Sequence, residues 1–325
     1  MKAPEFWMRG QGGLVAPLLS PFGQAFGLIG NMRCRLARPW RSPVPVLCVG
    51  NVVAGGAGKT PVALDLAARL QTMGRAVAFL SRGYGGTEIG PHRVDSTADT
   101  ADRVGDEPLL LGRQATTWVA RNRVAGARAA STHADIIVMD DGFQNPSLVK
   151  NASVLVVDGG YGIGNGYLLP AGPLREPLGH ALYRTDCVVI VGEDRSEAGR
   201  MISAITPELP ILRARIIPGA ETNRLSGKKI IAFAGIGRPE KFYRTLSDAG
   251  CNLVATRCFA DHHPYSTPEI ARLKNLAADH NGVLVTTEKD MVRIPEDQRA
   301  GIEVLTITLQ WDDEAPLTSL LERLS

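Results

Sequence analysis

Short apolar runs alternate with helical patterns along most of the chain. Several runs are continuous stretches of Val, Ile and Leu, which is typical of parallel strands covered on both faces. Helical patterns at Thr60–Met73, Pro239–Ala249 and Pro268–Asp279 lie between such runs. This alternation predicts a doubly wound α/β fold with a mostly parallel sheet. The expected strands are Val44–Gly50, Ala76–Leu80, Thr117–Ala120, Ile136–Met139, Val154–Val157, Val188–Val191, Ile211–Ile217, Ile230–Ala234, Leu253–Arg257, Val283–Thr286 and Val304–Thr308.

A glycine-rich loop follows the first expected strand and opens a helix. From Gly50 it reads Gly-Asn-Val-Val-Ala-Gly-Gly-Ala-Gly-Lys-Thr-Pro, and this context predicts a P-loop that binds the phosphates of ATP. Lys59 is expected to reach the β- and γ-phosphates, and the Thr60 hydroxyl to bind Mg²⁺. Val53 stands where the usual pattern has a glycine. The expected nucleotide-binding residues are Asn51, Gly55, Gly56, Ala57, Gly58, Lys59, Thr60 and Pro61.

Two carboxylates follow the expected strand Ile136–Met139 directly. Asp140 and Asp141 therefore lie where the acidic partner of a P-loop is needed. We expect Asp140 to hold Mg²⁺, directly or through water, and Asp141 to orient the metal or the attacking group. A strand-end acid that caps a helix is the structural alternative.

Arginines in loops at strand ends indicate a site for the phosphate acceptor. Arg82 and Tyr84 follow the strand Ala76–Leu80, and the carboxyl ends of parallel strands are where open α/β sheets bind ligands. Arg175 lies in a proline-rich loop, where it can meet a substrate phosphate. Arg121 and Arg123 are weaker candidates of the same kind.

Two carboxylates are candidates for the catalytic base, which accepts the proton of the acceptor hydroxyl. Asp106 and Glu107 precede a proline and a helical pattern, so either can act as the base or cap the helix. His262 and His263 are adjacent, and no further metal-ligating side chain lies nearby at ligand spacing. We therefore expect one histidine to be the polar partner of the catalytic acid, with a buried structural histidine as the alternative.

The N-terminal stretch from Gly10 to Met32 carries no charge and is bracketed by Arg9 and Arg33. Its six glycines and two prolines make it weakly hydrophobic for a membrane-spanning helix. An apolar segment followed by a basic cluster suits an anchor at an anionic membrane surface. A pair of ordinary helices packed on the core is the alternative.

Composition narrows the class of protein. Hydrophobic residues make up 44% of the 325 residues, so the chain can bury a core. A net charge of +3 gives no reason to expect a nucleic-acid partner. The five cysteines form no C-x-x-C pair, which favours a reducing compartment over a disulfide framework or a zinc site. No obligate protein partner is inferred.

These motifs together resemble the lipid A 4′-kinase (tetraacyldisaccharide 4′-kinase) family over nearly the whole chain. The matching segments are Gly-Asn-x-x-x-Gly-Gly-x-Gly-Lys-Thr-Pro at 50–61, Ser-Arg-Gly-Tyr-Gly at 81–85, Gly-Asp-Glu-Pro at 105–108, Asp-Asp-Gly-Phe-Gln at 140–144, Leu-Leu-Pro-Ala-Gly-Pro-Leu-Arg-Glu at 168–176, Asp-His-His at 261–263 and Thr-Glu-Lys-Asp at 287–290. Asn145 departs from the pattern, since the family often has a histidine there.

The resemblance implies transfer of the ATP γ-phosphate to the 4′-hydroxyl of a tetraacyldisaccharide 1-phosphate, giving lipid IVA. It implies a site at the cytoplasmic face of the bacterial inner membrane, with the N-terminal segment touching the bilayer. It also makes Asp106 the base and His262 its support, with Lys59 and Asp141 as the other catalytic residues. The expected substrate-binding residues are Arg82, Tyr84, Glu107, Arg121, Gln144 and Arg175.

The polar stretch Glu221–Lys229 precedes a new strand and marks a domain boundary. We expect an N-terminal membrane-associating segment at 1–35, a P-loop kinase domain at 36–225 and a smaller α/β domain at 226–325. A P-loop GTPase or metallochaperone-type switch is one alternative function, and a kinase of a soluble metabolite is another. The role of the Thr287–Asp290 motif stays open, with nucleotide contact as a guess.

Overall fold

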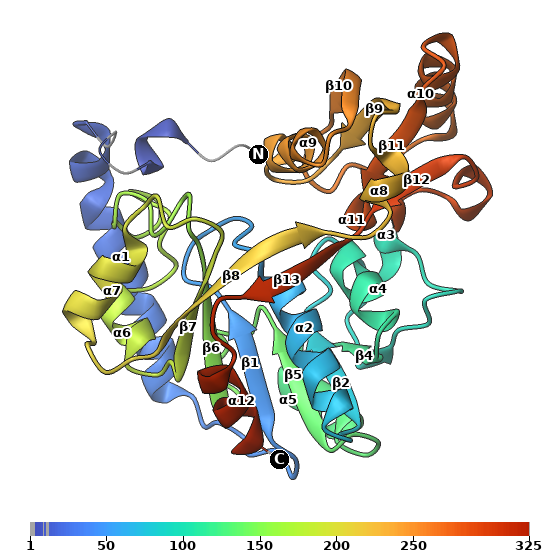
Figure 1. Ribbon diagram of the computed structural model, residues 1–325. Helices are drawn as coiled ribbons and strands as arrows, with labels where there is room; N and C mark the ends of the chain where they lie inside the picture. The colour runs from blue at the N-terminus through green and yellow to red at the C-terminus, as the bar shows by residue number, and fades with distance from the viewer. Residues whose placement is uncertain (1–3, 9, 11–12, 325) are drawn as a thin grey trace.

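A nine-stranded sheet organises the larger domain of the computed structural model, which describes residues 4–8, 10 and 13–324. Its strand order is β13-β8-β7-β6-β1-β5-β2-β4-β3 (Figure 1). The edge strands β13 and β3 are antiparallel to their neighbours, and the strands between them are parallel. The strands are β1 (Val46–Gly50), β2 (Val77–Ser81), β3 (His92–Arg93), β4 (Thr116–Val119), β5 (Ile136–Asp140), β6 (Ala152–Asp158), β7 (Cys187–Val191), β8 (Ile211–Pro218) and β13 (Ile307–Trp311).

Helices cover both faces of this sheet, as the unbroken apolar strands require. Along β1, Leu47 and Val49 pack in a core with α2 and α12, while Val46 and Cys48 pack in a second core with α5, α6 and α7. Successive side chains of a strand point to opposite faces, so both sets are buried. This arrangement confirms the predicted doubly wound fold. The helices are α2 (Lys59–Thr72), α3 (Ala101–Val104), α4 (Asp106–Gly112), α5 (Arg123–Ala130), α6 (Leu178–Leu182), α7 (Ala198–Ile205) and α12 (Ala315–Glu322).

The smaller domain repeats this layering around a parallel four-stranded sheet. The order is β10-β9-β11-β12, with α9 packed in one core and α10 with α11 in the other. Its elements are α8 (Thr222–Leu225), β9 (Lys229–Ala234), α9 (Pro239–Asp248), β10 (Asn252–Cys258), α10 (Thr267–Asp279), β11 (Val283–Thr287), α11 (Glu288–Met291), a 3₁₀ turn η2 (Glu296–Gln298) and β12 (Ile302–Leu305).

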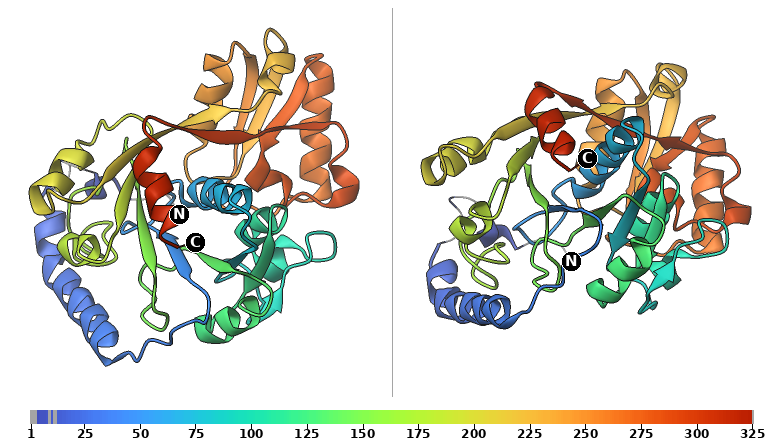
Figure 2. Two further views of the ribbon diagram at one scale, coloured as in Figure 1. Left: turned by 60° about the horizontal axis from the view of Figure 1, so that its bottom comes forward. Right: turned by 90° about the horizontal axis from the view of Figure 1, so that it is seen from below.

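The two domains are joined by a pair of strands rather than by one linker. β8 leaves the large sheet, and the chain returns through β13, which pairs antiparallel with β8 (Figures 1 and 2). The single strand expected at Val304–Thr308 is wrong, because Thr306 separates β12 of the small sheet from β13 of the large one. Thr306 donates its backbone N–H and its hydroxyl to the Glu221 carboxylate, at 2.5 and 2.6 Å, which fixes the turn between them.

The return strand corrects the expected extent of the smaller domain. Residues 307–322 were expected in a smaller domain spanning 226–325, but they form β13 and α12 on the large sheet. Leu317, Leu320 and Leu321 of α12 are buried beside α2 in the core of the larger domain. The apolar pattern of this segment indicated a strand and could not indicate which of two sheets it joins.

The helix α1 (Val15–Leu36) lies along the outside of the larger domain, after a 3₁₀ turn η1 (Glu5–Trp7) (Figure 1). Gly23 and Gly27 face Leu168 so closely that a Cβ on either would meet it within 3.0 Å. The opposite face of α1 is apolar and exposed. In the described part of the chain, no helix is long and apolar enough to span a membrane. Residues 1–3, 9, 11 and 12 of the expected 1–35 segment lie outside the described residues.

Candidate active site

The P-loop lies between β1 and α2, and a second loop clamps it. Ala54 donates its backbone N–H to Pro173 O at 2.8 Å, and Arg175 donates its backbone N–H to Val52 O at 2.7 Å. Val53 lies between these bonds and pairs with Leu174. An extended, paired backbone does not need glycine, which explains why valine is tolerated at this position.

The crest of the P-loop is open, and its end has the geometry of an anion site. A Cβ on Gly55 or Gly56 would meet no described atom within 4 Å. Gly58 has a φ of 82° at the N-cap of α2, a conformation that glycine adopts without steric cost. Lys59, Thr60 and Pro61 follow as the first residues of α2, where free N–H groups and the helix dipole favour a phosphate. Asn51 stabilises the loop by donating its amide to Gly55 O at 3.2 Å.

Asp140 is a buried carboxylate without a protein partner. It ends β5 beside the P-loop strand, its side chain is fully buried, and neither carboxylate oxygen has a hydrogen bond within the described residues. Burial raises the pKa of Asp140 to about 7; the charge of Glu107 adds to this and the charge of Lys59 opposes it. An unpartnered buried carboxylate is costly, so this site is suited to a cation.

Asp141 faces the P-loop lysine and the clamping loop. Its carboxylate lies 3.7 Å from Lys59 Nζ and accepts from Arg175 Nη1 at 3.1 Å. Burial raises the pKa of Asp141, but the charges of Lys59 and Arg175 outweigh this and hold it below its usual range. The structure therefore brings together three predicted site residues, Lys59, Asp141 and Arg175, at the carboxyl ends of β1 and β5.

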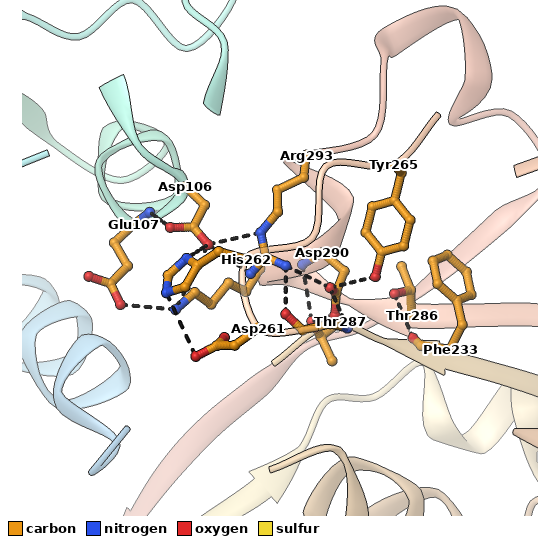
Figure 3. Close-up of polar contacts among 12 residues, drawn as sticks. Asp106, Glu107, Phe233, Asp261, His262, Tyr265, Thr286, Thr287, Asp290 and Arg293 are labelled. Carbon is orange, nitrogen blue, oxygen red and sulfur yellow. Dashed lines mark hydrogen bonds and ion pairs between the residues drawn. The ribbon is translucent and has the colours of Figure 1, made fainter. Parts of the chain in front are cut away.

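Asp106 begins α4 at the boundary between the domains. The preceding Gly105 has a φ of 90°, and a Cβ there would lie 2.7 Å from Tyr84 O, so only glycine allows this close approach. His262, in the loop after β10, lies with Nδ1 2.9 Å from Asp106 Oδ2. Arg293 also reaches Asp106 Oδ2, through Nε at 2.9 Å (Figure 3). The expected contact between an acid and one histidine is present, and the second histidine, His263, bonds Glu269 instead.

Cations from the smaller domain keep Asp106 ionised. Burial raises its pKa, but the hydrogen bond with His262 and the charges of Lys289 and Arg293 outweigh this and hold the pKa well below its usual range. Lys289 also lies 3.0 Å from the Glu107 carboxylate. Glu107 thus lies in an ion pair with Lys289, and its charge raises the pKa of Asp140.

The remaining predicted residues fall into two groups. Tyr84 is 70% exposed and its ring centroid lies 5.7 Å from that of His262, so it lies beside the Asp106 cluster. Arg121 is exposed and lines a pocket of about 520 Å³ with Arg33 of α1 and the buried Arg123. Burial lowers the pKa of Arg123 to about 10, and the charge of the nearby exposed Arg82 contributes.

Gln144 has a supporting place. Its amide donates to Asn51 O at 2.8 Å and to Glu176 Oε1 at 3.0 Å. Both amide hydrogens are therefore used within the protein, which links the P-loop to the loop that clamps it. Only the amide oxygen of Gln144 is left to face a ligand.

Comparison with known proteins shows which family this chain belongs to. The family model described as Tetraacyldisaccharide-1-P 4′-kinase matches residues 15–325. The chain belongs to this family. A tetraacyldisaccharide 4′-kinase of Paramagnetospirillum magneticum is 48% identical over 325 residues, which cover 100% of this chain and 99% of the relative. Another, of Methylorubrum populi, is 50% identical over 321 residues, which cover 98% and 97%.

A solved structure supports the same assignment. The crystal structure of "apo" form LpxK from Aquifex aeolicus in complex with ATP has a TM-score of 0.76 and 25% identity, covering 95% of this chain and 99% of that chain. The resemblance stated from the motifs is thereby confirmed, as are the fold class and ATP binding as a property of the family. The two relatives are named as 4′-kinases and not as GTPases or metallochaperones.

Two residues of the smaller domain that lie beside Asp106 and Glu107 were not among the predicted site residues. Arg293 and Lys289 both reach the carboxylates of α4, and neither was a candidate. Lys289 belongs to the Thr287–Asp290 motif, whose role stayed open. Arg293 lies three residues after Asp290 and bonds it at 3.0 Å, so helical spacing from the motif is the one signal that pointed to it.

Proposed function

We propose that this protein transfers the γ-phosphate of ATP to the 4′-hydroxyl of a tetraacyldisaccharide 1-phosphate, giving lipid IVA in lipid A biosynthesis. The observation that carries the proposal is the combination of a P-loop lysine beside two strand-end acids with an Asp106–His262 pair, in a chain matched by this kinase family over residues 15–325. Family membership supplies the substrate class, and the geometry supplies residues for each step.

The nucleotide side follows from the charges on the large sheet. The N–H groups at the start of α2 and the ammonium of Lys59 neutralise the transferring phosphates. Asp141 pairs with Lys59 on the other side, and Arg175 pairs with the same Asp141 carboxylate. Arg175 lies on the clamping loop and bonds Asp141 at 3.1 Å, so it would add a second positive charge beside the transferring phosphate.

The residues present fit Mg²⁺. Asp140 offers two buried oxygens without partners, and the Thr60 hydroxyl lies at the start of α2. No cluster of three or more His, Cys, Asp or Glu suited to a metal occurs in residues 4–8, 10 and 13–324, but a kinase metal takes most of its ligands from phosphates and water. Bound Mg²⁺ would neutralise charge that develops on the β- and γ-phosphates.

The acceptor side lies at Asp106. Its carboxylate orients the 4′-hydroxyl and accepts the proton as the new O–P bond forms and the bond to ADP breaks. His262 holds that carboxylate through its 2.9 Å contact. Tyr84 is mostly exposed beside His262, and we assign it to stack on the sugar. We assign the exposed Arg82 to an anionic group of the substrate.

The pocket of about 520 Å³ supports an acidic, lipid-linked substrate. Arg33, Arg121 and Arg123 line it, and Arg123 Nε has no hydrogen-bond partner in the described chain. The pocket lies where α1 ends. We assign the 1-phosphate of the disaccharide to this basic pocket.

Peripheral membrane contact through α1 completes the proposal. Large apolar side chains on its free face are strongly exposed, among them Leu18 at 74%, Phe22 at 66% and Ile29 at 69%. Arg33 and Arg35 follow in the last turn. An apolar face with adjacent cations binds an anionic lipid surface, here the cytoplasmic face of the bacterial inner membrane.

An ATP-phosphate transfer assay with tetraacyldisaccharide 1-phosphate in detergent tests the proposal. We expect Mg²⁺-dependent transfer, and a loss on the order of 10²–10³ in kcat for Lys59→Ala, with Lys228→Ala at an exposed position as the matched control. A folded, ATP-binding protein that leaves the lipid unphosphorylated overturns the substrate assignment. Transfer to soluble sugars without detergent would favour a soluble-metabolite kinase.

A further inference from the structure

Arg293 places a buried positive charge on the acid at the domain boundary. Its side chain is 3% exposed, as is that of Asp106. Nε donates to Asp106 Oδ2 at 2.9 Å, and Nη2 lies 2.7 Å from the same oxygen. Asp106 belongs to the larger domain and Arg293 to the smaller one, so this ion pair joins two domains (Figure 3).

The guanidinium is itself fixed by the smaller domain. Arg293 Nη1 donates to Asp290 Oδ1 at 3.0 Å and to Gly235 O at 2.7 Å. Asp290 is fully buried and accepts from the Tyr265 hydroxyl at 2.8 Å and the Thr287 hydroxyl at 2.6 Å. With so many partners, Arg293 cannot follow Asp106 if that side chain moves, and its position is set by α11 and the ends of β9 and β11.

We propose that Arg293 is a positioning residue for phosphate transfer, which holds the Asp106 carboxylate in the orientation that receives the acceptor hydroxyl, with Asp290 as its anchor. This inference rests on the proposed function. A planar guanidinium suits the task, because it can hold two carboxylates at once through N–H groups with fixed directions. It also gives the Thr287–Asp290 motif a role that does not involve the nucleotide.

The pair links the base to the arrangement of the domains. His262, Lys289 and Arg293 all come from the smaller domain, and Asp106 contacts each of them within 4 Å. Separating the domains would remove the His262 hydrogen bond and the two cations, Lys289 and Arg293, from Asp106 together. The base is therefore complete only when the smaller domain lies against α4.

Charge and orientation can be separated experimentally. The titratable and charged groups that face Asp106 are His262, Lys289 and Arg293, with Glu107 on its own helix and Asp261 at 3.8 Å from His262. Without Arg293 the pKa of Asp106 rises, but His262 and Lys289 still keep it ionised near neutral pH. A fall in kcat near neutral pH thus reports lost orientation, and a shifted acid limb of the pH profile reports the lost charge.

The experiment compares Arg293→Gln and Arg293→Lys with wild type in the lipid transfer assay, with activity normalised to folded protein by circular dichroism. We expect Arg293→Gln to lower kcat by roughly 10- to 100-fold, leave the KM for ATP within about threefold, and move the acid limb upward. Arg293→Lys should retain more kcat than Arg293→Gln. Lysine keeps the positive charge but lacks the planar guanidinium with its several N–H donors. Arg272→Gln, an exposed arginine of α10, is the matched control.

The outcomes are distinguishable from failure of the proposed function. If wild type does not phosphorylate the lipid, the proposed function fails first. If wild type is active and Arg293→Gln keeps kcat within twofold with an unmoved acid limb, the inference is overturned. If Arg293→Gln does not fold, Arg293→Lys and Asp290→Asn decide: a loss of fivefold or more in each is expected, and wild-type kcat in both overturns the role.

Discussion

The two halves of this site are built in opposite ways. The phosphate-binding half comes from neighbouring strands of one sheet: the P-loop follows β1, Asp140 ends β5, and these strands pair directly. The acceptor half joins Asp106 to His262 and Arg293, which lie 156 and 187 residues further along the chain and in the other domain. One half is complete within a domain, and the other exists only where two domains meet.

This difference indicates that the arrangement of the two domains controls the acceptor half of the site and not the phosphate-binding half. Lys59, Asp140 and Asp141 lie at the ends of elements of the larger domain, so we expect their places not to depend on the smaller domain. Asp106 depends on cations that move with the smaller domain. We therefore expect the enzyme to bind ATP before its acceptor side is complete.

The largest effect is expected for Asp106→Asn, which tests whether the two halves of the site can be separated. It removes the base while leaving the P-loop intact, so kcat should fall on the order of 10²–10⁴ with ATP affinity unchanged. Steady-state kinetics and ATP titration calorimetry would measure both, with Asp102→Asn at an exposed position of α3 as control. A matching loss of ATP affinity would contradict the separation of the halves.

The second prediction concerns stability at the metal side. Because the folded-state pKa of Asp140 is about 7 against an ordinary 3.8, the folded protein binds this proton more tightly and loses stability as pH rises between these values. Without Mg²⁺ and nucleotide, Asp140→Asn should raise the free energy of unfolding at pH 8 by about 4 kcal/mol, at 1.36 kcal/mol per pKa unit. The gain should vanish near pH 4.

Urea unfolding at pH 4 and pH 8 would measure this effect. Asp141→Asn is the matched control with the opposite sign, because Lys59 and Arg175 hold the pKa of Asp141 below its usual range. Ionised Asp141 stabilises the folded state above its ordinary pKa, so its removal should cost stability at pH 8. If both variants changed the free energy of unfolding in the same direction at pH 8, the raised pKa of Asp140 would be contradicted.

The smallest effect is expected at the partly exposed ion pairs between the domains, which join Lys241 and Arg238 to Asp158. Lys241 of α9 lies 2.5 Å from Asp158 at the end of β6, but its side chain is 49% exposed and Arg238 also pairs with Asp158. Lys241→Ala should therefore change the free energy of unfolding by less than about 1 kcal/mol and leave kcat within twofold. Urea unfolding and kinetics check this; a larger loss of kcat would place part of the domain contact at the rim.

Most of the fold could be predicted from the sequence because most strands belong to alternating strand–helix units. Unbroken apolar runs such as Val188–Val191 are buried on both faces, so pattern and structure coincide. The segment Val304–Thr308 failed because pairing partners do not show in a strand's own pattern. The edge strand β3 is two residues long and partly exposed, so it has no apolar run to detect.

The site divides in the same manner. Lys59, Thr60 and Asp140 could be predicted because their chemistry is tied to local strand–loop–helix order. Arg293 could not, because an arginine after a short helix carries no sign of what it contacts. Gln144 matched the family motif, yet its amide hydrogens bond within the protein.

By itself, the sequence determined the nucleotide chemistry, the doubly wound fold and the family, because glycine turns, apolar periodicity and ordered motifs are local properties. Tertiary structure alone decided that β13 returns to the large sheet and that Arg293 lies beside Asp106 and His262. The physical reason is distance along the chain. A contact across more than 150 residues is selected by the packing of two complete domains, and no short stretch of sequence contains it.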